Sequence, residues 1–300
     1  MFRFGEVWNG SGTFDPIAAH RTFGDAVLEQ FPFDAFVSKT ITLEARAGNP
    51  PPRLWETPSG LINSIGLPNK GLDGFLESDF PFLAQLPVPL IVSVMGFDHD
   101  QLARLVSAVA ERDAAHAIEL NFSCPNVETG LIMGADPGEI ARALERLRPL
   151  TAKPLIAKLT PTAQDQAAVA RAAEDAGADA LSLINTLPGM ALDPASGRPW
   201  LGAASGGQSG PAVRAIALKQ IADVARASQL PIVGMGGIAS GRDAADFLRA
   251  GATVAAVGTE SFRDPAAAVR VRTELAPLTA NIAPDASAQP TPSGDAKAVA

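Results

Sequence analysis

The chain has 300 residues and a formal net charge of −8, from 24 basic and 32 acidic side chains. No Lys/Arg cluster stands out, which argues against nucleic-acid binding and leaves solubility as the simplest role of the acidic balance. Its apolar runs are short and broken by Gly or Pro, so no membrane-spanning helix is expected. No basic segment followed by an apolar one marks a signal peptide, so we expect a soluble, cytoplasmic protein.

Eight short apolar runs predict eight β-strands separated by Ala- and Leu-rich helical segments. The predicted strands are Glu6–Gly10, Ala35–Thr42, Leu90–Met95, Ile118–Phe122, Leu155–Leu159, Ala180–Ile184, Ile232–Met235 and Val254–Val257. The clearest predicted helices are Asp98–Arg112, Gly138–Leu147, Gln164–Ala176, Ala212–Ala227 and Arg242–Ala250. Nearly continuous apolar strands are typical of parallel sheets buried on both faces. The pattern predicts an α/β fold, a (β/α)8 TIM barrel, with an open doubly wound sheet as the alternative.

Three segments depart from this repeat. Leu43–Phe82 and Leu187–Gly210 follow the second and sixth strands and are rich in Gly and Pro. We expect long loops at the C-terminal face of the barrel, acting as lids over a ligand. Ala280–Ala300 is rich in Ala, Pro and Ser without periodicity, so we expect residues 1–279 to form the barrel domain and 280–300 a disordered tail.

The only cysteine, Cys124, lies in the segment Asn121–Asn126 at the end of the fourth predicted strand. A thiol there would face the barrel mouth and could remove a proton from a substrate. The alternative is a small buried hydrophobic side chain. One cysteine forms neither an intramolecular disulfide nor an all-cysteine iron–sulfur cluster. The three histidines have no metal-ligand spacing, and we expect no metal site.

Lys39 and Lys158 end the second and fifth predicted strands. A lysine within an apolar strand requires an anion or a polar cavity, because burying it without a partner is costly. Two lysines at strand ends favour an anionic ligand or a flavin ring system. The alternative is an ion pair with a core carboxylate such as Glu119.

Glycine-rich turns follow the last two predicted strands, at Gly234–Ile238 and Val257–Glu260. Glycines there let backbone N–H groups approach a phosphate, and this is the usual phosphate site of such barrels. Gly234, Gly236 and Ala239 also match a dinucleotide fingerprint, with Glu260 as its acidic partner. We prefer a mononucleotide phosphate site, since the turn comes after six strands and does not open a domain.

Five asparagines fall in predicted loops or at strand ends, where their amides suit a planar ligand with imide edges. Each of them alone would be an ordinary turn residue. They are Asn63, Asn69, Asn121, Asn126 and Asn185.

Several motifs occur together, in order, between about Gly10 and Phe262. They are Gly10–Phe14, Ser38–Thr40, Gly48–Arg53, Asn63–Leu67, Asn121–Asn126, Lys158, Asn185–Thr186, Ser209–Pro211, Gly236–Gly237 and Gly258–Thr259. With them the sequence resembles the class 1 dihydroorotate dehydrogenases, and most of all the catalytic FMN subunit of the NAD-linked 1B subclass.

The resemblance implies oxidation of (S)-dihydroorotate to orotate in pyrimidine biosynthesis, with FMN in the barrel mouth. Cys124 would remove the C5 proton while a hydride moves from C6 to the flavin. FMN would be held by Ser11, Lys39, Thr40, Asn121, Lys158, Ile184, Gly210, Gly236, Gly237, Gly258 and Thr259. The substrate would be held by Lys39, Asn63, Ser64, Ile65, Gly66, Leu67, Asn121, Asn185 and Thr186.

The resemblance also implies a homodimer, and for the NAD-linked subclass a heterotetramer with a subunit that carries FAD and an iron–sulfur cluster. The sequence departs from the family pattern at three places. Ser93 stands where the family usually has Asn, and Asp15 stands where Gly is usual. The chain also starts almost at its first strand, where a hairpin usually closes the barrel floor.

Three alternatives remain open from the sequence. One is a reductase of free pyrimidine bases similar to dihydropyrimidine dehydrogenase, although those enzymes usually carry His where Asn126 stands. Another is a single-subunit dihydroorotate dehydrogenase linked to fumarate. The third is a barrel without catalytic activity that serves as a scaffold, against which Cys124 and the two strand-end lysines argue.

Overall fold

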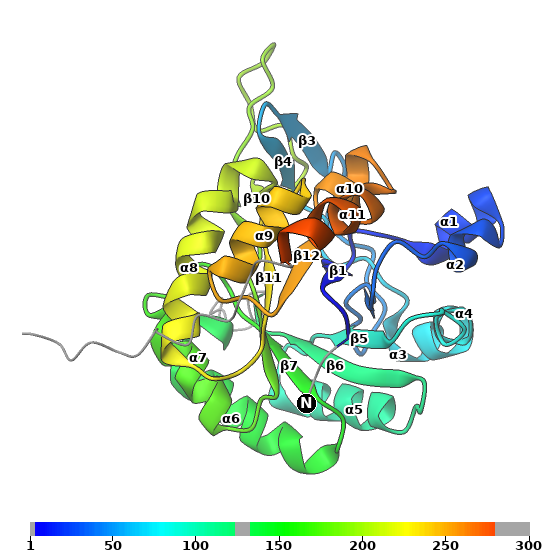
Figure 1. Cartoon of the computed structure of the whole chain (residues 1–300), viewed down its shortest axis with the longest axis vertical. Helices are drawn as coiled ribbons and strands as arrows, with labels where there is room; N and C mark the ends of the chain where they lie inside the picture. Colours follow the sequence, from blue (N-terminus) through cyan, green and yellow to red (C-terminus); the bar gives the residue numbers. More distant parts are fainter. Residues whose placement is uncertain (1–3, 124–132, 280–300) are drawn as a thin grey trace, which may run out of the picture.

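The structure, a computed structural model, describes residues 4–123 and 133–279. Eight parallel strands form its centre, and their order is β1-β12-β11-β8-β7-β6-β5-β2. A parallel bridge between Trp8 and Ala35 joins the two ends of this order. The predicted TIM barrel is therefore confirmed (Figure 1). The strands are β1 (Val7–Asn9), β2 (Phe36–Val37), β5 (Leu90–Val94), β6 (Ala115–Asn121), β7 (Leu155–Lys158), β8 (Ala180–Leu183), β11 (Ile232–Met235) and β12 (Val254–Val257).

Helices follow the strands and surround the barrel (Figure 1). Asp98, Asp136 and Asp165 accept hydrogen bonds from first-turn N–H groups, so the three helices that follow begin where the capping pattern predicts. The helices are α1 (Pro16–Phe23), α2 (Ala26–Glu29), α3 (Gly71–Gly74), α4 (Phe80–Leu83), α5 (His99–Ala110), α6 (Pro137–Leu147), α7 (Gln166–Asp175), α8 (Arg214–Ala227), α9 (Gly241–Arg249), α10 (Glu260–Arg263) and α11 (Ala267–Thr279). Short π or 3-10 turns are η1 (Phe75–Asp79), η2 (Met133–Ala135), η3 (Arg148–Leu150) and η4 (Pro211–Val213).

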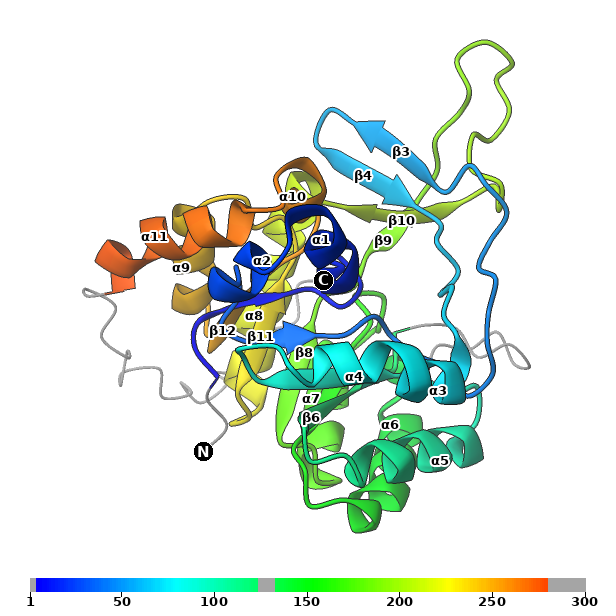
Figure 2. The same ribbon diagram turned by 90° about the vertical axis from the view of Figure 1, so that its right-hand side faces the viewer.

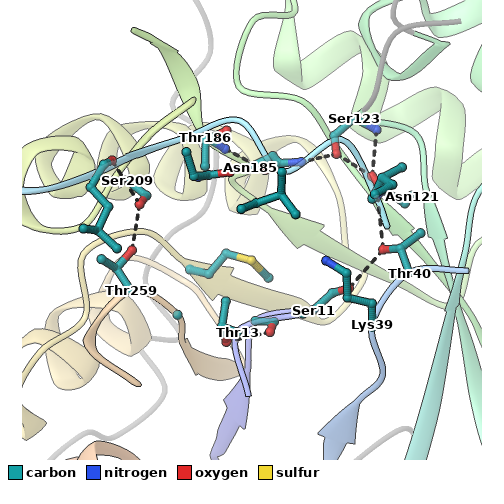
Figure 3. A pocket seen from close by; sticks show the side chains of 18 of the residues that line it. Ser11, Thr13, Lys39, Thr40, Asn121, Ser123, Asn185, Thr186, Ser209 and Thr259 are labelled. Atoms are coloured by element: carbon teal, nitrogen blue, oxygen red, sulfur yellow. Dashed lines mark hydrogen bonds between the residues drawn. The ribbon is translucent and has the colours of Figure 1, made fainter. Parts of the chain in front are cut away.

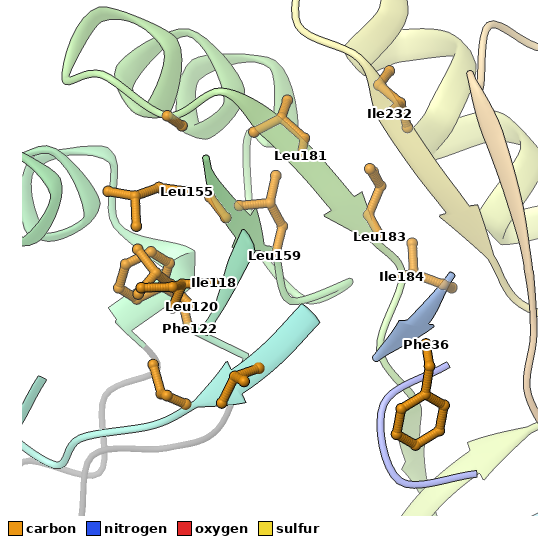
Figure 4. Close-up of a cluster of buried hydrophobic side chains, with 14 of the residues drawn as sticks. Phe36, Ile118, Leu120, Phe122, Leu155, Leu159, Leu181, Leu183, Ile184 and Ile232 are labelled. Carbon is orange, nitrogen blue, oxygen red and sulfur yellow. The ribbon is translucent and has the colours of Figure 1, made fainter. Parts of the chain in front are cut away.

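The strands bury apolar side chains on both faces, which explains their continuous hydrophobicity. On β6, Ile118 and Leu120 belong to the layer between strands and helices (Figure 4). Ala117 belongs to the cluster inside the barrel. Trp8 lies in the interior cluster, and Phe4 packs against it. Phe4 precedes β1, so an apolar side chain covers the N-terminal end of the barrel. In the family pattern, a hairpin usually closes this end.

The two segments expected to be loops form a second sheet, which corrects that expectation. Its strands are antiparallel and ordered β3-β4-β10-β9, that is Leu54–Thr57, Gly60–Asn63, Gly206–Ser209 and Leu187–Gly189. Both segments leave the C-terminal ends of barrel strands, and Figure 2 shows the sheet on one side of the barrel. The pairing of Asn63 with Gly207 brings the two segments together.

Asp15, one of the departures from the family pattern, has a local structural role. Its carboxylate accepts hydrogen bonds from the N–H groups of Ile17 and Ala18, both at 3.0 Å, and caps α1. This capping function explains the aspartate at position 15, and no contact with a ligand is needed to account for it.

Candidate functional site

A cavity of about 620 Å³ opens at the C-terminal ends of the barrel strands, beneath the antiparallel sheet. Residues after β1, β2, β6, β8, β11 and β12 line it, together with residues of β4 and β10. Figure 3 shows polar side chains from these separate elements around one space. The position is the one at which TIM barrels bind their ligands.

One wall of the cavity is a continuous row of hydrogen-bonded polar side chains. The Asn185 amide donates to Ser123 Oγ, which donates to Asn121 Oδ1 at 2.5 Å (Figure 3). Asn121 Nδ2 lies 3.4 Å from Thr40 Oγ1, and Thr40 Oγ1 is 3.0 Å from Ser11 Oγ. Asn185 Oδ1 also accepts from the Thr186 N–H at 2.7 Å, which fixes how this amide is oriented. The wall therefore presents amides in set orientations rather than freely rotating ones.

Two lysines contribute cations from different strands. Lys39 extends into the space beside Ser11 (Figure 3). A Cβ atom at Gly12, which has a φ of +75°, would come within 3.2 Å of Lys39 Nζ, so glycine at this position makes room for the lysine. Lys158 lines the cavity from the end of β7 and is 6% exposed. Its Nζ lies 4.0 Å from Oε1 of buried Glu119, so the ion pair considered from the sequence exists, and Lys158 lines the cavity as well.

The turns after β11 and β12 form a concave surface of backbone together with Gly210. We call Gly210, Gly236, Gly237 and Gly258 the glycine cradle. Gly236 and Gly237 have φ values of +133° and +81°, conformations that residues with a side chain rarely adopt. A Cβ atom at Gly237 would also lie 2.7 Å from the Gly210 carbonyl oxygen. At Gly258 a Cβ atom would meet only Thr13, at 3.7 Å, so the backbone there faces open space. This is a surface that backbone N–H groups can offer to a phosphate.

The structure brings together the predicted site residues that it describes. All of those expected at FMN, and all of those expected at the substrate, line the one cavity. Cys124 and Asn126 lie outside the described residues, although Ser123, which precedes Cys124, lines the cavity. Asn69 does not line it. Its amide instead joins Thr42, Leu67 and Gly71, and so shapes the loop that carries the predicted substrate residues.

Several lining residues were not predicted. The guanidinium of Arg46 lies 4.9 Å from the centre of the Phe97 ring, and both residues border the cavity. Arg46 was not predicted because it lies outside the motifs Gly48–Arg53 and Asn63–Leu67 that were recognised in its segment. Ser209 accepts a hydrogen bond from Thr259 Oγ1 at 2.9 Å and donates to the Leu61 carbonyl, so it ties the second sheet to the glycine cradle. It lies in the motif Ser209–Pro211, which was a usable signal.

Within the described part of the chain, no group of three or more His, Cys, Asp or Glu side chains could hold a metal ion. None of the helices there is both long enough and apolar enough to cross a membrane.

A barrel whose strand ends enclose a cavity with a backbone phosphate cradle and strand-end cations is typical of enzymes that bind phosphate-bearing ligands. The family model for dihydroorotate dehydrogenase matches residues 16–278. The dihydroorotate dehydrogenase B (NAD(+)) catalytic subunit of Citrifermentans bemidjiense is 43% identical over 270 residues, which cover 90% of this chain and 87% of that protein. The subunit of the same name from Trichlorobacter lovleyi is 47% identical over 266 residues, covering 88% and 86%.

The chain therefore belongs to the dihydroorotate dehydrogenase family, a family of flavoproteins, and these relatives support the NAD-linked 1B subclass that its motifs indicated. Among solved structures, a crystal structure of DHODH in complex with ferulenol from Eimeria tenella superposes with a TM-score of 0.72. That match has 22% identity and covers 91% of this chain and 81% of the other, so it supports the fold.

Proposed function

We propose that this protein oxidises dihydroorotate to orotate, with FMN bound in the cavity at the barrel mouth. The observation that carries the proposal is the charge of the cavity. Its described lining includes three cations, Lys39, Arg46 and Lys158, and contains no Asp or Glu. FMN has a phosphate and dihydroorotate a carboxylate, so both ligands are anions that this lining suits.

The described residues fit FMN in kind and in place. The glycine cradle of Gly210, Gly236, Gly237 and Gly258 suits the phosphate, and Thr259 adds a hydroxyl. Ile184 offers an apolar surface to the ring system. Ser11, Lys39, Thr40, Asn121 and Lys158, which line the same cavity, would offer it polar atoms. Bound FMN would supply the acceptor for the hydride that leaves the substrate.

The proposed substrate site lies between the row of hydrogen-bonded polar side chains and the loop after β4. Asn63 donates its amide to the Gly207 carbonyl at 3.2 Å, and Ser64 Oγ accepts from Asn49 Nδ2 at 2.8 Å. These bonds hold the loop through Ile65, Gly66 and Leu67 at the cavity. Lys39, Asn121, Asn185 and Thr186 complete the set and would orient the ring and its carboxylate.

Cys124 is the proposed base. It directly follows Ser123, whose hydroxyl group belongs to the row of hydrogen-bonded polar side chains in the cavity wall. A thiolate that removes the C5 proton would allow the hydride to leave C6. The proton would then remain on the Cys124 sulfur until solvent exchanges it.

Electrons would leave through a partner. We propose that residues 1–279 form a catalytic barrel which, as a homodimer, joins a subunit carrying FAD and an iron–sulfur cluster, and which passes electrons to NAD in the cytoplasm. Support comes from the relatives named catalytic subunits of NAD(+)-linked enzymes.

The test begins with the purified protein. We expect a yellow protein that releases FMN on denaturation, and turnover with dihydroorotate but not with dihydrouracil, using an artificial acceptor. A protein that binds no flavin under any condition would refute the cofactor proposal. Preference for dihydrouracil would move the protein to the reductases of free pyrimidine bases.

A further inference from the structure

A buried carboxylate lies beneath the cavity and is not used by the function proposed above. Glu119 is on β6, two residues before Asn121, and is 2% exposed. It does not belong to the residues that line the cavity. The strand register pairs Glu119 with Ser93 on one side and Ile156 on the other, while Asn121 pairs with Lys158. Glu119 therefore lies one layer below the cavity floor, inside the barrel.

Three neighbours on three other strands surround this carboxylate. Ser93 Oγ donates to Oε1 at 2.9 Å, and Ser182 Oγ donates to Oε2 at 3.1 Å. Lys158 Nζ lies 4.0 Å from Oε1. Both carboxylate oxygens therefore have hydroxyl donors, and the Lys158 ammonium group lies beside them. A buried charge is tolerated when it is both paired and hydrogen-bonded, and Glu119 meets both conditions.

The Glu119 carboxylate is linked to the cavity wall through Ser93. Ser93 Oγ is 2.9 Å from Thr40 Oγ1, and Thr40 contacts Ser11 in the wall. Asparagine at position 93 would place a larger amide between Glu119 and Thr40. The serine found here, one of the departures from the family pattern, instead connects the two by a single hydroxyl group.

We infer that Glu119 is a positioning residue that holds the Lys158 ammonium at the cavity floor and offsets part of its charge, and so lowers the reduction potential of the bound flavin. This inference rests on the proposed function, because it requires a flavin above Lys158. A flavin gains negative charge when it is reduced, so a cation beneath it stabilises the reduced form. A carboxylate paired with that cation weakens this stabilisation, because it offsets the positive charge and holds the ammonium group down towards Glu119.

The experiment compares Glu119→Gln with the wild-type holoenzyme in redox titrations and in FMN binding. We expect a higher midpoint potential in the variant. Equivalently, the ratio of affinities for reduced and oxidised FMN should rise on the order of tenfold, which corresponds to about 1.4 kcal/mol. An unchanged potential in folded, FMN-loaded Glu119→Gln would overturn the inference.

A double-mutant cycle separates positioning through Lys158 from a direct field effect. In the Lys158→Gln background, Glu119→Gln should change the affinity ratio much less than in the wild-type background. Equal changes in both backgrounds would mean that Glu119 does not act through Lys158. Asp179→Asn is the matched control. Asp179 also pairs with a cation, Arg148, at 2.6 Å, but it precedes β8 at the other end of the barrel, and its loss should leave the potential unchanged.

A second variant covers the case in which Glu119→Gln does not fold. Glu119→Asp keeps the charge but moves the carboxylate away from Lys158 by one methylene. We expect a smaller rise in potential, and an unchanged potential would again overturn the inference. If the wild-type protein itself bound no flavin, the proposed function would fail first, and the two failures are thereby distinguishable.

Discussion

Single side chains acquire their roles from the position at which they fall on a strand. Along β6, Ala117 belongs to the interior cluster, Glu119 lies in the layer above it and Asn121 lines the cavity. This is the two-residue period of a β-strand. The strand-end lysines and asparagines were therefore predictable from the sequence. The contacts of the Ser93 and Ser182 hydroxyl groups were not, because a serine in a strand carries no signal of its partner.

The sharpest prediction at this scale concerns the proposed base. Cys124→Ser should keep FMN bound but reduce the rate of flavin reduction by dihydroorotate roughly 10²–10⁴-fold at neutral pH, because a hydroxyl group is a far weaker base than a thiol. Anaerobic stopped-flow absorbance measures this rate directly. A rate close to that of the wild type would remove Cys124 from the mechanism.

Lys158→Ala should damage the flavin site more than the substrate site. Without the ammonium group, the reduced flavin loses a favourable charge, and Glu119 is left buried without its cation. We expect partial loss of FMN or a lower potential, measured by flavin content and redox titration. If occupancy and potential were both unchanged, the lysine would serve only its ion pair with Glu119.

At the scale of elements, the eight strands and five main helices could be predicted because their apolar periodicity and aspartate caps are local signals. The second sheet could not. On β3 the exposure alternates without a buried side, and β10 reads Gly-Gly-Gln-Ser, so neither segment has the hydrophobicity of a strand. The pairing of β10 with β4 joins residues about 150 positions apart, such as Gln208 with Ile62, and the closed barrel brings these together.

The turn after β11 allows a test of the phosphate cradle. Gly237→Ala should weaken FMN binding roughly tenfold, since its φ is +81° and the new Cβ atom would press on the Gly210 carbonyl. Fluorescence titration of the protein stripped of flavin gives the affinity. Gly177→Ala is the matched control: its φ is +94°, but the residue follows α7, and its new Cβ atom would meet the flexible Arg148 side chain. This control should lower thermal stability without changing FMN affinity, and equal effects on FMN affinity in both variants would contradict the cradle.

At the scale of the whole molecule, the proposed phosphate site and the weak dinucleotide match at Gly234–Ala239 overlap, because Gly236 and Gly237 of that match line the cavity at the barrel mouth. One site does not hold FMN and NAD together. The single cysteine also leaves the chain without ligands for a cluster that would carry electrons outward.

The isolated chain should therefore reduce artificial acceptors but not NAD at a useful rate, and addition of a partner with FAD and an iron–sulfur cluster should restore NAD reduction. Steady-state assays with each acceptor decide this. Rapid NAD reduction by the chain alone would contradict the two-subunit account. Efficient turnover with fumarate alone would indicate the single-subunit subclass.

The central claim is that dihydroorotate reduces FMN held at the mouth of this barrel. Its most direct test is an anaerobic titration of the purified, flavin-loaded chain with dihydroorotate, followed by the visible absorbance of the flavin. The account predicts that the flavin bleaches in proportion to the dihydroorotate added and that an equal amount of orotate forms. Bound FMN that stays oxidised in excess dihydroorotate, while dithionite still reduces it, would contradict the account.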